Sequence, residues 1–133
     1  MKKQLIIGLL GVFMLMIQGC SSSLLKGTWQ YDGGIYNGNI MHASPDLVMQ
    51  RTFTAKKYEA FVLEDGEQPQ KYGSGHYKIQ DSIFYITSEY NNPPSDLTGK
   101  TIVYTFKLDT GRLIINGTLP NGMLVEEHWK KIK

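Results

Sequence analysis

Short segments of alternating apolar and polar residues recur along most of this chain, separated by turn residues such as Asp65-Gly66 and Asp109-Thr110-Gly111. Alternation with a period of two is typical of strands with one buried face, and no window places apolar residues at helical spacing. The sequence therefore predicts strands over residues 26–32, 47–54, 57–64, 70–80, 83–89, 100–108, 112–117 and 123–132.

The lengths of the connections indicate how these eight strands are arranged. Most connections are short turns, which suit consecutive antiparallel neighbours. A sandwich with a Greek key would need longer crossing connections, for which only residues 33–46 and the segment around Pro93-Pro94 are candidates. Closure into a barrel also removes exposed strand edges. We therefore expect an all-β fold, an eight-stranded up-and-down antiparallel barrel over residues 26–133.

The N-terminal residues have a different character. Lys2 and Lys3 precede an apolar run over residues 5–17, which is shorter than the about 20 residues that a membrane-spanning helix needs. The run ends in Ile17-Gln18-Gly19-Cys20, which resembles the lipobox of bacterial lipoproteins, with Gln18 where that family usually has a smaller residue. The alternative is an ordinary signal peptide that leaves Cys20 as a free or buried thiol.

The lipoprotein resemblance implies a division of the chain and a location. Residues 1–19 would be a cleaved signal peptide, and residues 20–25 an acylated cysteine, carrying fatty acids such as palmitate, with a short tether. Ser21 is not the aspartate that retains some lipoproteins at the inner membrane. The resemblance therefore implies a lipid-anchored protein of the cell envelope, at the outer membrane of a Gram-negative bacterium.

Charge and cysteine content exclude several classes of protein. The chain has 14 basic and 12 acidic residues, and losing Lys2 and Lys3 with the signal leaves 12 of each. A neutral mature chain predicts no nucleic acid and no acidic surface as a partner. A single cysteine excludes an internal disulfide and a cysteine-based zinc site.

Three short motifs extend the comparison to a family. Gly27-Thr28-Trp29 resembles the G-x-W signature of the lipocalin superfamily, and Gly73-Ser74-Gly75-His76-Tyr77 and residues 126–131 resemble strands of small bacterial lipocalin-like lipoproteins. The resemblance implies that Gly27, Trp29 and Trp129 plug one end of the barrel. In lipocalins an arginine of the last strand stacks on the first tryptophan, whereas this chain offers Lys130 or Lys131. The alternative for both tryptophans is plain core packing.

Strand alternation assigns an inward face to each strand. The predicted interior is apolar and bears tyrosine, one arginine and one glutamate, and lone buried charges should pair or meet water. A functional interpretation places a small ligand there, contacted by Arg51, Phe53, Tyr104, Phe106 and Glu127. The alternative is a satisfied polar cluster in a filled core. An interior volume of about 300 Å³ or more would favour the ligand.

Residues 33–46 lack a strand pattern and are rich in glycine and asparagine. In lipocalins the connection between the first two strands folds over the barrel mouth, so the resemblance implies a lid that contains Ile35, Tyr36, Met41 and His42. The alternative is a surface loop.

The chain contains no recognisable catalytic pattern. The three histidines are far apart, Ser74 is not in a nucleophile elbow, and Glu126 and Glu127 are adjacent and so point to opposite faces of a strand. We therefore expect no enzyme, no metal and no cofactor. The expected function is a non-catalytic binding module for a small hydrophobic or amphipathic molecule, and the alternative is a packed barrel that holds another envelope protein.

Overall fold

The computed structural model describes residues 24–133, so the predicted signal peptide and Cys20 lie outside the described residues. No helix within this range is long and apolar enough to cross a bilayer. The strands are β1 (Gly27–Tyr36), β2 (Asn39–Met41), β3 (Leu47–Phe53), β4 (Lys57–Glu64), β5 (Gln70–Gln80), β6 (Ile83–Asn91), β7 (Thr101–Asp109), β8 (Arg112–Thr118) and β9 (Leu124–Lys131).

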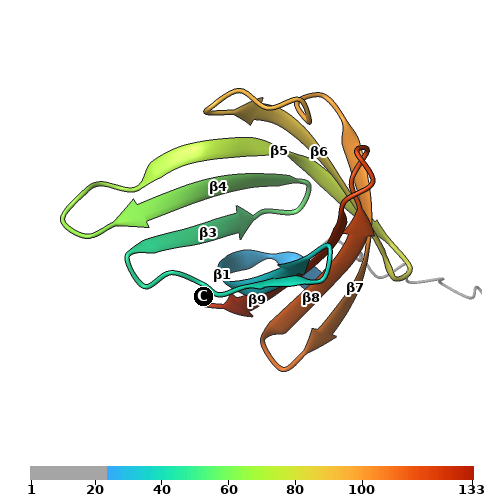
Figure 1. The fold of residues 1–133 in the computed structure, drawn as a ribbon, viewed down its shortest axis with the longest axis horizontal. Helices are drawn as coiled ribbons and strands as arrows, with labels where there is room; N and C mark the ends of the chain where they lie inside the picture. Colours follow the sequence, from blue (N-terminus) through green and yellow to red (C-terminus); the bar gives the residue numbers. More distant parts are fainter. Residues whose placement is uncertain (1–23) are drawn as a thin grey trace, which may run out of the picture.

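These strands form one antiparallel sheet that closes on itself. Their order is β2-β1-β3-β4-β5-β6-β7-β8-β9, and β1 also pairs with β9. Figure 1 shows the strands curving around a shared interior, with the β4–β5 hairpin reaching beyond the others. The predicted eight-stranded up-and-down barrel is confirmed and consists of β1 and β3–β9, while β2 is an additional strand at the edge of β1.

The prediction that residues 33–46 lack strand structure is wrong. β1 continues to Tyr36, and Asn37 and Gly38 turn the chain into β2, which pairs Ile35 with Ile40. Both turn residues have a positive φ, 49° and 81°, as a tight two-residue hairpin requires. Asn-Gly is the dipeptide best suited to such a turn, and the polar composition of the segment concealed this signal.

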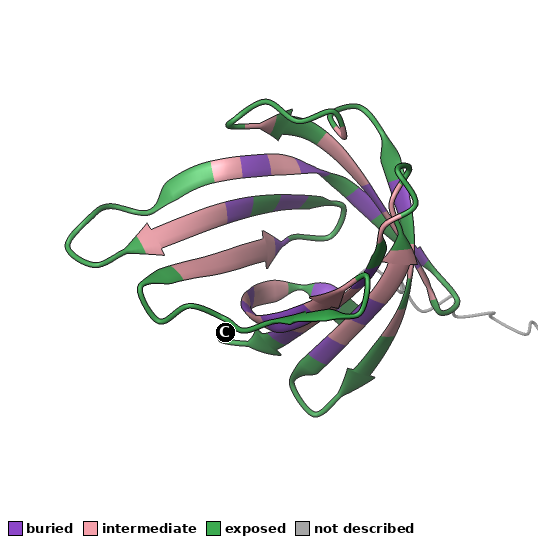
Figure 2. Ribbon diagram, viewed as in Figure 1, coloured by how far each residue is buried: buried purple, intermediate pink, exposed green. Residues whose placement is uncertain are grey.

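Antiparallel pairing brings alternate strand ends together at two ends of the barrel. At one end, which we call the closed end, β1, β4, β6 and β8 begin and β3, β5, β7 and β9 finish. We call the opposite end the open end. Buried aromatic side chains fill the closed end: the ring centroids of Phe53 and Tyr77 lie 5.0 Å apart, and those of Tyr77 and Phe84 5.8 Å. Figure 2 shows buried residues at intervals along the strands, while most of the turns are exposed.

Candidate functional site

Trp29 is part of the plug at the closed end. It is 2% exposed, and its Nε1 donates a hydrogen bond to the Leu25 carbonyl oxygen at 2.9 Å. Gly27 lets the C-terminus approach, because a Cβ there would lie 2.4 Å from the Lys133 carbonyl oxygen. Of the two lysines proposed as partners of Trp29, the Lys131 ammonium lies over the indole, 5.8 Å from its centroid.

Above this plug, three predicted ligand residues come together with Tyr36, predicted for the lid, and Trp129, predicted for the plug. Three further tyrosines of the group had no predicted role. Inward-facing Phe53 and Leu113 are buried, whereas the equally inward Arg51, Tyr104 and Glu127 stay partly exposed. Since these three face the interior, their exposed surface faces the lumen of the barrel. We call the group around them the polar layer, which consists of Arg51, Glu127, Tyr31, Tyr36, Tyr58, Tyr72, Tyr104 and Trp129.

Arg51 is the centre of the polar layer. Its guanidinium carbon lies 4.6 Å from the centroid of the Trp129 ring and 5.5 Å from that of Tyr58. The Tyr72 hydroxyl lies close enough to Arg51 for each side chain to shift the pKa of the other. The Arg51 Nε is buried and has no hydrogen-bond partner among the described residues. The aromatic faces therefore stabilise the charge without using all of its hydrogen-bond donors.

Glu127 is held by tyrosines. The Tyr36 hydroxyl donates a hydrogen bond to Glu127 Oε2 at 3.0 Å, and the Tyr31 and Tyr36 hydroxyl oxygens lie 2.7 Å apart. A chain of three hydrogen-bonding side chains thus joins β1 to β9. Burial, followed by the charge of Glu127, raises the pKa of Tyr36 well above its usual range, so Tyr36 remains a donor.

Arg51 and Glu127 act on each other through the lumen without direct contact, since the ion pairs among the described residues do not include them. Burial disfavours the charge on Arg51, but the Tyr72 hydroxyl and Glu127 outweigh burial and raise its pKa. Arg51 therefore stays charged. The polar layer thus presents a positive charge on Arg51 and a negative charge on Glu127 to the lumen, with neutral tyrosine hydroxyls between them.

Two tyrosines of the polar layer depend on local backbone features. Tyr72 is the extra residue of a β-bulge, because β4 pairs Ala60 with Gly73 and then Phe61 with Lys71. Simple alternation therefore assigns it to the wrong face.

Tyr104 lies against Gly117, where a Cβ would be 2.5 Å from the tyrosine ring. Burial and the charge of Glu127 raise the pKa of Tyr104 to about 12.

A cavity of about 700 Å³ opens beside the polar layer at the open end. Leu47, Met49 and Val62 give it apolar walls, and Tyr72 belongs both to its lining and to the surroundings of Arg51. This volume lies within the range of small-molecule sites, although the cavity is at the mouth and not in the barrel interior. The cavity thus leads from solvent toward the charged residue.

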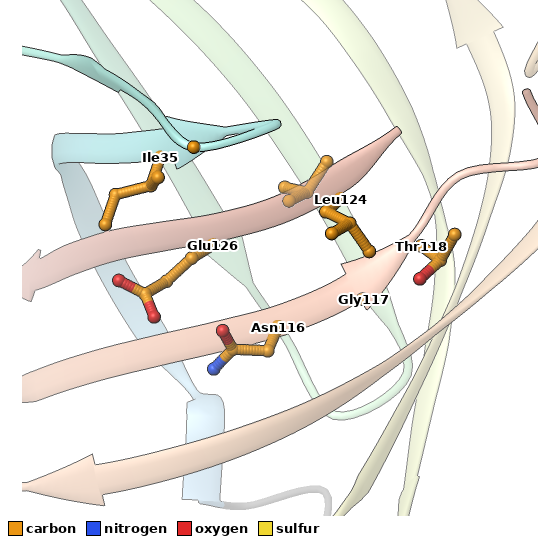
Figure 3. A pocket seen from close by; sticks show the side chains of 8 residues that line it. Ile35, Asn116, Gly117, Thr118, Leu124 and Glu126 are labelled. Carbon is orange, nitrogen blue, oxygen red and sulfur yellow. The ribbon is translucent and has the colours of Figure 1, made fainter. Parts of the chain in front are cut away.

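The remaining predicted site residues lie elsewhere. Phe53 is part of the closed-end plug, and Phe106 packs against the same core. Of the four predicted lid residues, Tyr36 points inward to Glu127, and Met41 and His42 are exposed on the hairpin and the segment after it. Ile35 faces outward, into a groove of about 460 Å³ that Leu124 also lines (Figure 3).

Two of the three histidines face carboxylates on the outside of the barrel. His76 faces Glu89, and His128 Nε2 lies 2.8 Å from Glu126 Oε2, both outside the lumen. Within residues 24–133, no three histidine, cysteine, aspartate or glutamate side chains are grouped to hold a metal ion.

Comparison with known structures identifies the fold. A lipocalin-like protein from Bacteroides uniformis superposes with a TM-score of 0.60 at 14% identity, over 81% of this chain and 98% of that one. The domain has a lipocalin-like fold. A redesigned β-barrel also matches, with a TM-score of 0.50 and 19% identity over 84% of this chain and 95% of that one. No family model and no curated protein matches the sequence.

Proposed function

We propose that this lipocalin-like domain is a non-catalytic binding module for a small amphipathic molecule, held at a membrane by acylated Cys20. The observation that carries the binding role is Arg51, a charged side chain with a buried donor that has no partner among the described residues. Buried donors in proteins are nearly always satisfied. A polar group of a ligand would satisfy it.

The shape of the mouth cavity indicates how such a ligand would lie. Its apolar part would contact Met49 and Val62, and its polar end would reach past Tyr72 to Arg51. The protonated phenols of Tyr36 and Tyr104 would supply further neutral donors. Glu127 accepts a hydrogen bond from Tyr36, but the raised pKa of this phenol makes it a donor and a poor nucleophile, so we propose binding without catalysis.

A titration tests the binding role. Residues 24–133 contain the closed barrel and a continuous hydrophobic core, so this part of the chain can be studied alone. Anilinonaphthalene sulfonate, a fluorescent anionic amphiphile, should bind and quench Trp129 emission. Arg51→Gln should weaken binding about tenfold, the effect of losing one charged hydrogen bond, and Arg112→Gln at the exposed closed end should not. Equal binding by both variants would contradict the role of Arg51.

The anchor is tested separately in a bacterial host. The full chain should lose residues 1–19 and gain the mass of acyl chains on Cys20, and Cys20→Ala should abolish both changes. A chain recovered from the outer membrane fraction supports the proposed location. An unacylated, cleaved chain in the soluble fraction would contradict it without affecting the proposed ligand site.

The second candidate function is a packed barrel that holds another envelope protein. Its support is the apolar surface beside the groove of Ile35, where Ile40 is 70% and Leu124 60% exposed. Crosslinking in intact cells should return a stoichiometric partner that Leu124→Asp abolishes. Val103→Asp, at a residue 49% exposed on β7, is the matched control. A crosslink that survives Leu124→Asp would contradict this function.

A further inference from the structure

The charged side chains of the described residues are sorted along the barrel axis. Seven acidic residues gather toward the open end: Asp46, Glu64, Asp65, Glu67, Glu89, Asp96 and Glu126. Nine exposed basic residues gather at the closed end: Lys26, Lys56, Lys57, Lys78, Lys107, Arg112, Lys130, Lys131 and Lys133. We call these nine the basic rim.

Strand pairing and turn contacts bring members of the basic rim from different strands to the same end of the barrel. Arg112 pairs with Lys130, and Lys131 donates its backbone N–H to the Gly111 carbonyl in the β7–β8 turn. On the other side, the Lys56 carbonyl accepts a hydrogen bond from Tyr77 near the end of β5. Lysines that are distant in the sequence therefore surround one end of the barrel.

Few neighbouring carboxylates neutralise this charge. Among the described residues, Arg112 is the member of the basic rim that forms an ion pair, with Asp32 at 3.4 Å. Asp81 and Asp109 lie in the turns of this end, and Glu59 on β4 is a further exposed carboxylate near it, 3.9 Å from Lys71. Like charges held on a rigid frame produce a positive potential that attracts anions and weakens with added salt.

The same end carries exposed apolar side chains, and the described part of the chain begins there at Leu24. Leu24, Leu108 and Ile132 are 49%, 38% and 45% exposed there. Cys20 precedes Leu24 by four residues, a reach of at most about 14 Å for an extended chain. Basic side chains mixed with apolar ones suit the headgroup region of a bilayer better than a nucleic acid backbone.

We propose that the basic rim docks the closed end onto an anionic lipid bilayer and seats the barrel upright, with its open end and mouth cavity facing away from the membrane. The choice of a bilayer rests on the proposed anchor at Cys20, and the docking is independent of any ligand in the lumen. The neutral total charge predicted no acidic partner, but that total does not report how the charges are distributed.

Vesicle binding tests this surface without the acyl chains. Residues 24–133 should sediment with phosphatidylcholine vesicles that contain about 30% phosphatidylglycerol, and high salt should release them. They should not bind vesicles of pure phosphatidylcholine. Lys56→Glu/Lys107→Glu should weaken binding at least about tenfold. Lys71→Glu/Lys100→Glu makes the same change in net charge at the open end and should stay within about twofold.

Three outcomes would overturn the proposal. The first is an equal loss of vesicle binding in the two double variants, and the second is equal binding to vesicles with and without phosphatidylglycerol. The third is an affinity for duplex DNA that equals the affinity for anionic vesicles at the same salt concentration. Failure of Cys20 acylation in cells would leave these measurements unchanged, so the two proposals fail separately.

A second measurement tests the orientation. Residues 24–133 contain no cysteine, so single exposed cysteines can be labelled with a polarity-sensitive dye at Ala55→Cys in the closed-end β3–β4 turn or Glu67→Cys in the open-end β4–β5 turn. Anionic vesicles should shift the emission of the dye at residue 55 to the blue and leave the dye at residue 67 unchanged. The reverse pattern would contradict the upright orientation.

Discussion

The Arg51 guanidinium on β3 lies 4.6 Å from the centroid of the Trp129 indole on β9. The two strands are not neighbours, because β1 runs between them and pairs Trp29 with Arg51 and Tyr31 with Trp129. Arg51 therefore reaches across β1 inside the barrel, where the negative face of the indole stabilises a charge that burial would otherwise penalise.

The stack predicts that Arg51→Lys is not conservative. An ammonium cannot keep the planar contact with Trp129, so we expect a loss of about 1–2 kcal/mol in the free energy of unfolding, measured by urea denaturation. Arg112→Lys, at an exposed ion pair, should change stability by less than about 0.5 kcal/mol. Equal stabilities of the two variants would show that the contact contributes nothing beyond charge.

The hydrogen bonds of Glu127 predict coupling between two strands. Tyr36→Phe removes the donor to Glu127 Oε2 and should cost about 1–3 kcal/mol of stability. Glu127→Gln keeps an acceptor oxygen and should cost less. A double-mutant cycle with both changes should give a coupling energy of about 1 kcal/mol, whereas additive effects would show that the two side chains act independently.

Tyr104 predicts a loss of stability in alkali. Its pKa is raised to about 12 from an unfolded value of 10.0, so the folded protein retains a proton that the unfolded chain releases. This contribution is complete below pH 10 and is lost as the pH rises toward 12. Tyr104→Phe should reduce the decline in unfolding free energy over this window by at most about 3 kcal/mol. Tyr90→Phe at the surface is the control, and identical slopes in the two variants would contradict the assignment.

The fit between Gly117 and Tyr104 predicts that a single methyl group disturbs the polar layer. Gly117→Ala places a Cβ 2.5 Å from the ring and 2.9 Å from the Val103 carbonyl, so we expect a loss of about 1–3 kcal/mol in thermal denaturation. Gly73→Ala is the matched control, because its nearest contacts would be an ordinary 3.5 Å. A Gly117→Ala variant as stable as the control would mean that the ring moves freely.

Local sequence accounts for most of the strands. Alternation and turn residues predicted the eight strands of the barrel to within a few residues, since side-chain period and turn chemistry act over short distances. The Asn37-Gly38 turn is also a local signal, but the short strand that pairs with β1 after it has no alternating pattern of its own. The β1–β2 hairpin was therefore predicted to be a loop. Alternation also assigned Arg51 and Glu127 to the interior, because it decides which face a residue occupies wherever the strand carries no bulge.

Tertiary structure decided what these inward residues meet. Tyr72 enters the polar layer through a bulge that only the pairing of β4 with β5 reveals. Arg51 meets Trp129 because the barrel closes through β1 and β9, and the basic rim exists because antiparallel pairing brings alternate turns to the same end. Strand identity is a local property of the chain, whereas these contacts join residues far apart in it, and closure of the sheet is the physical step that brings them together.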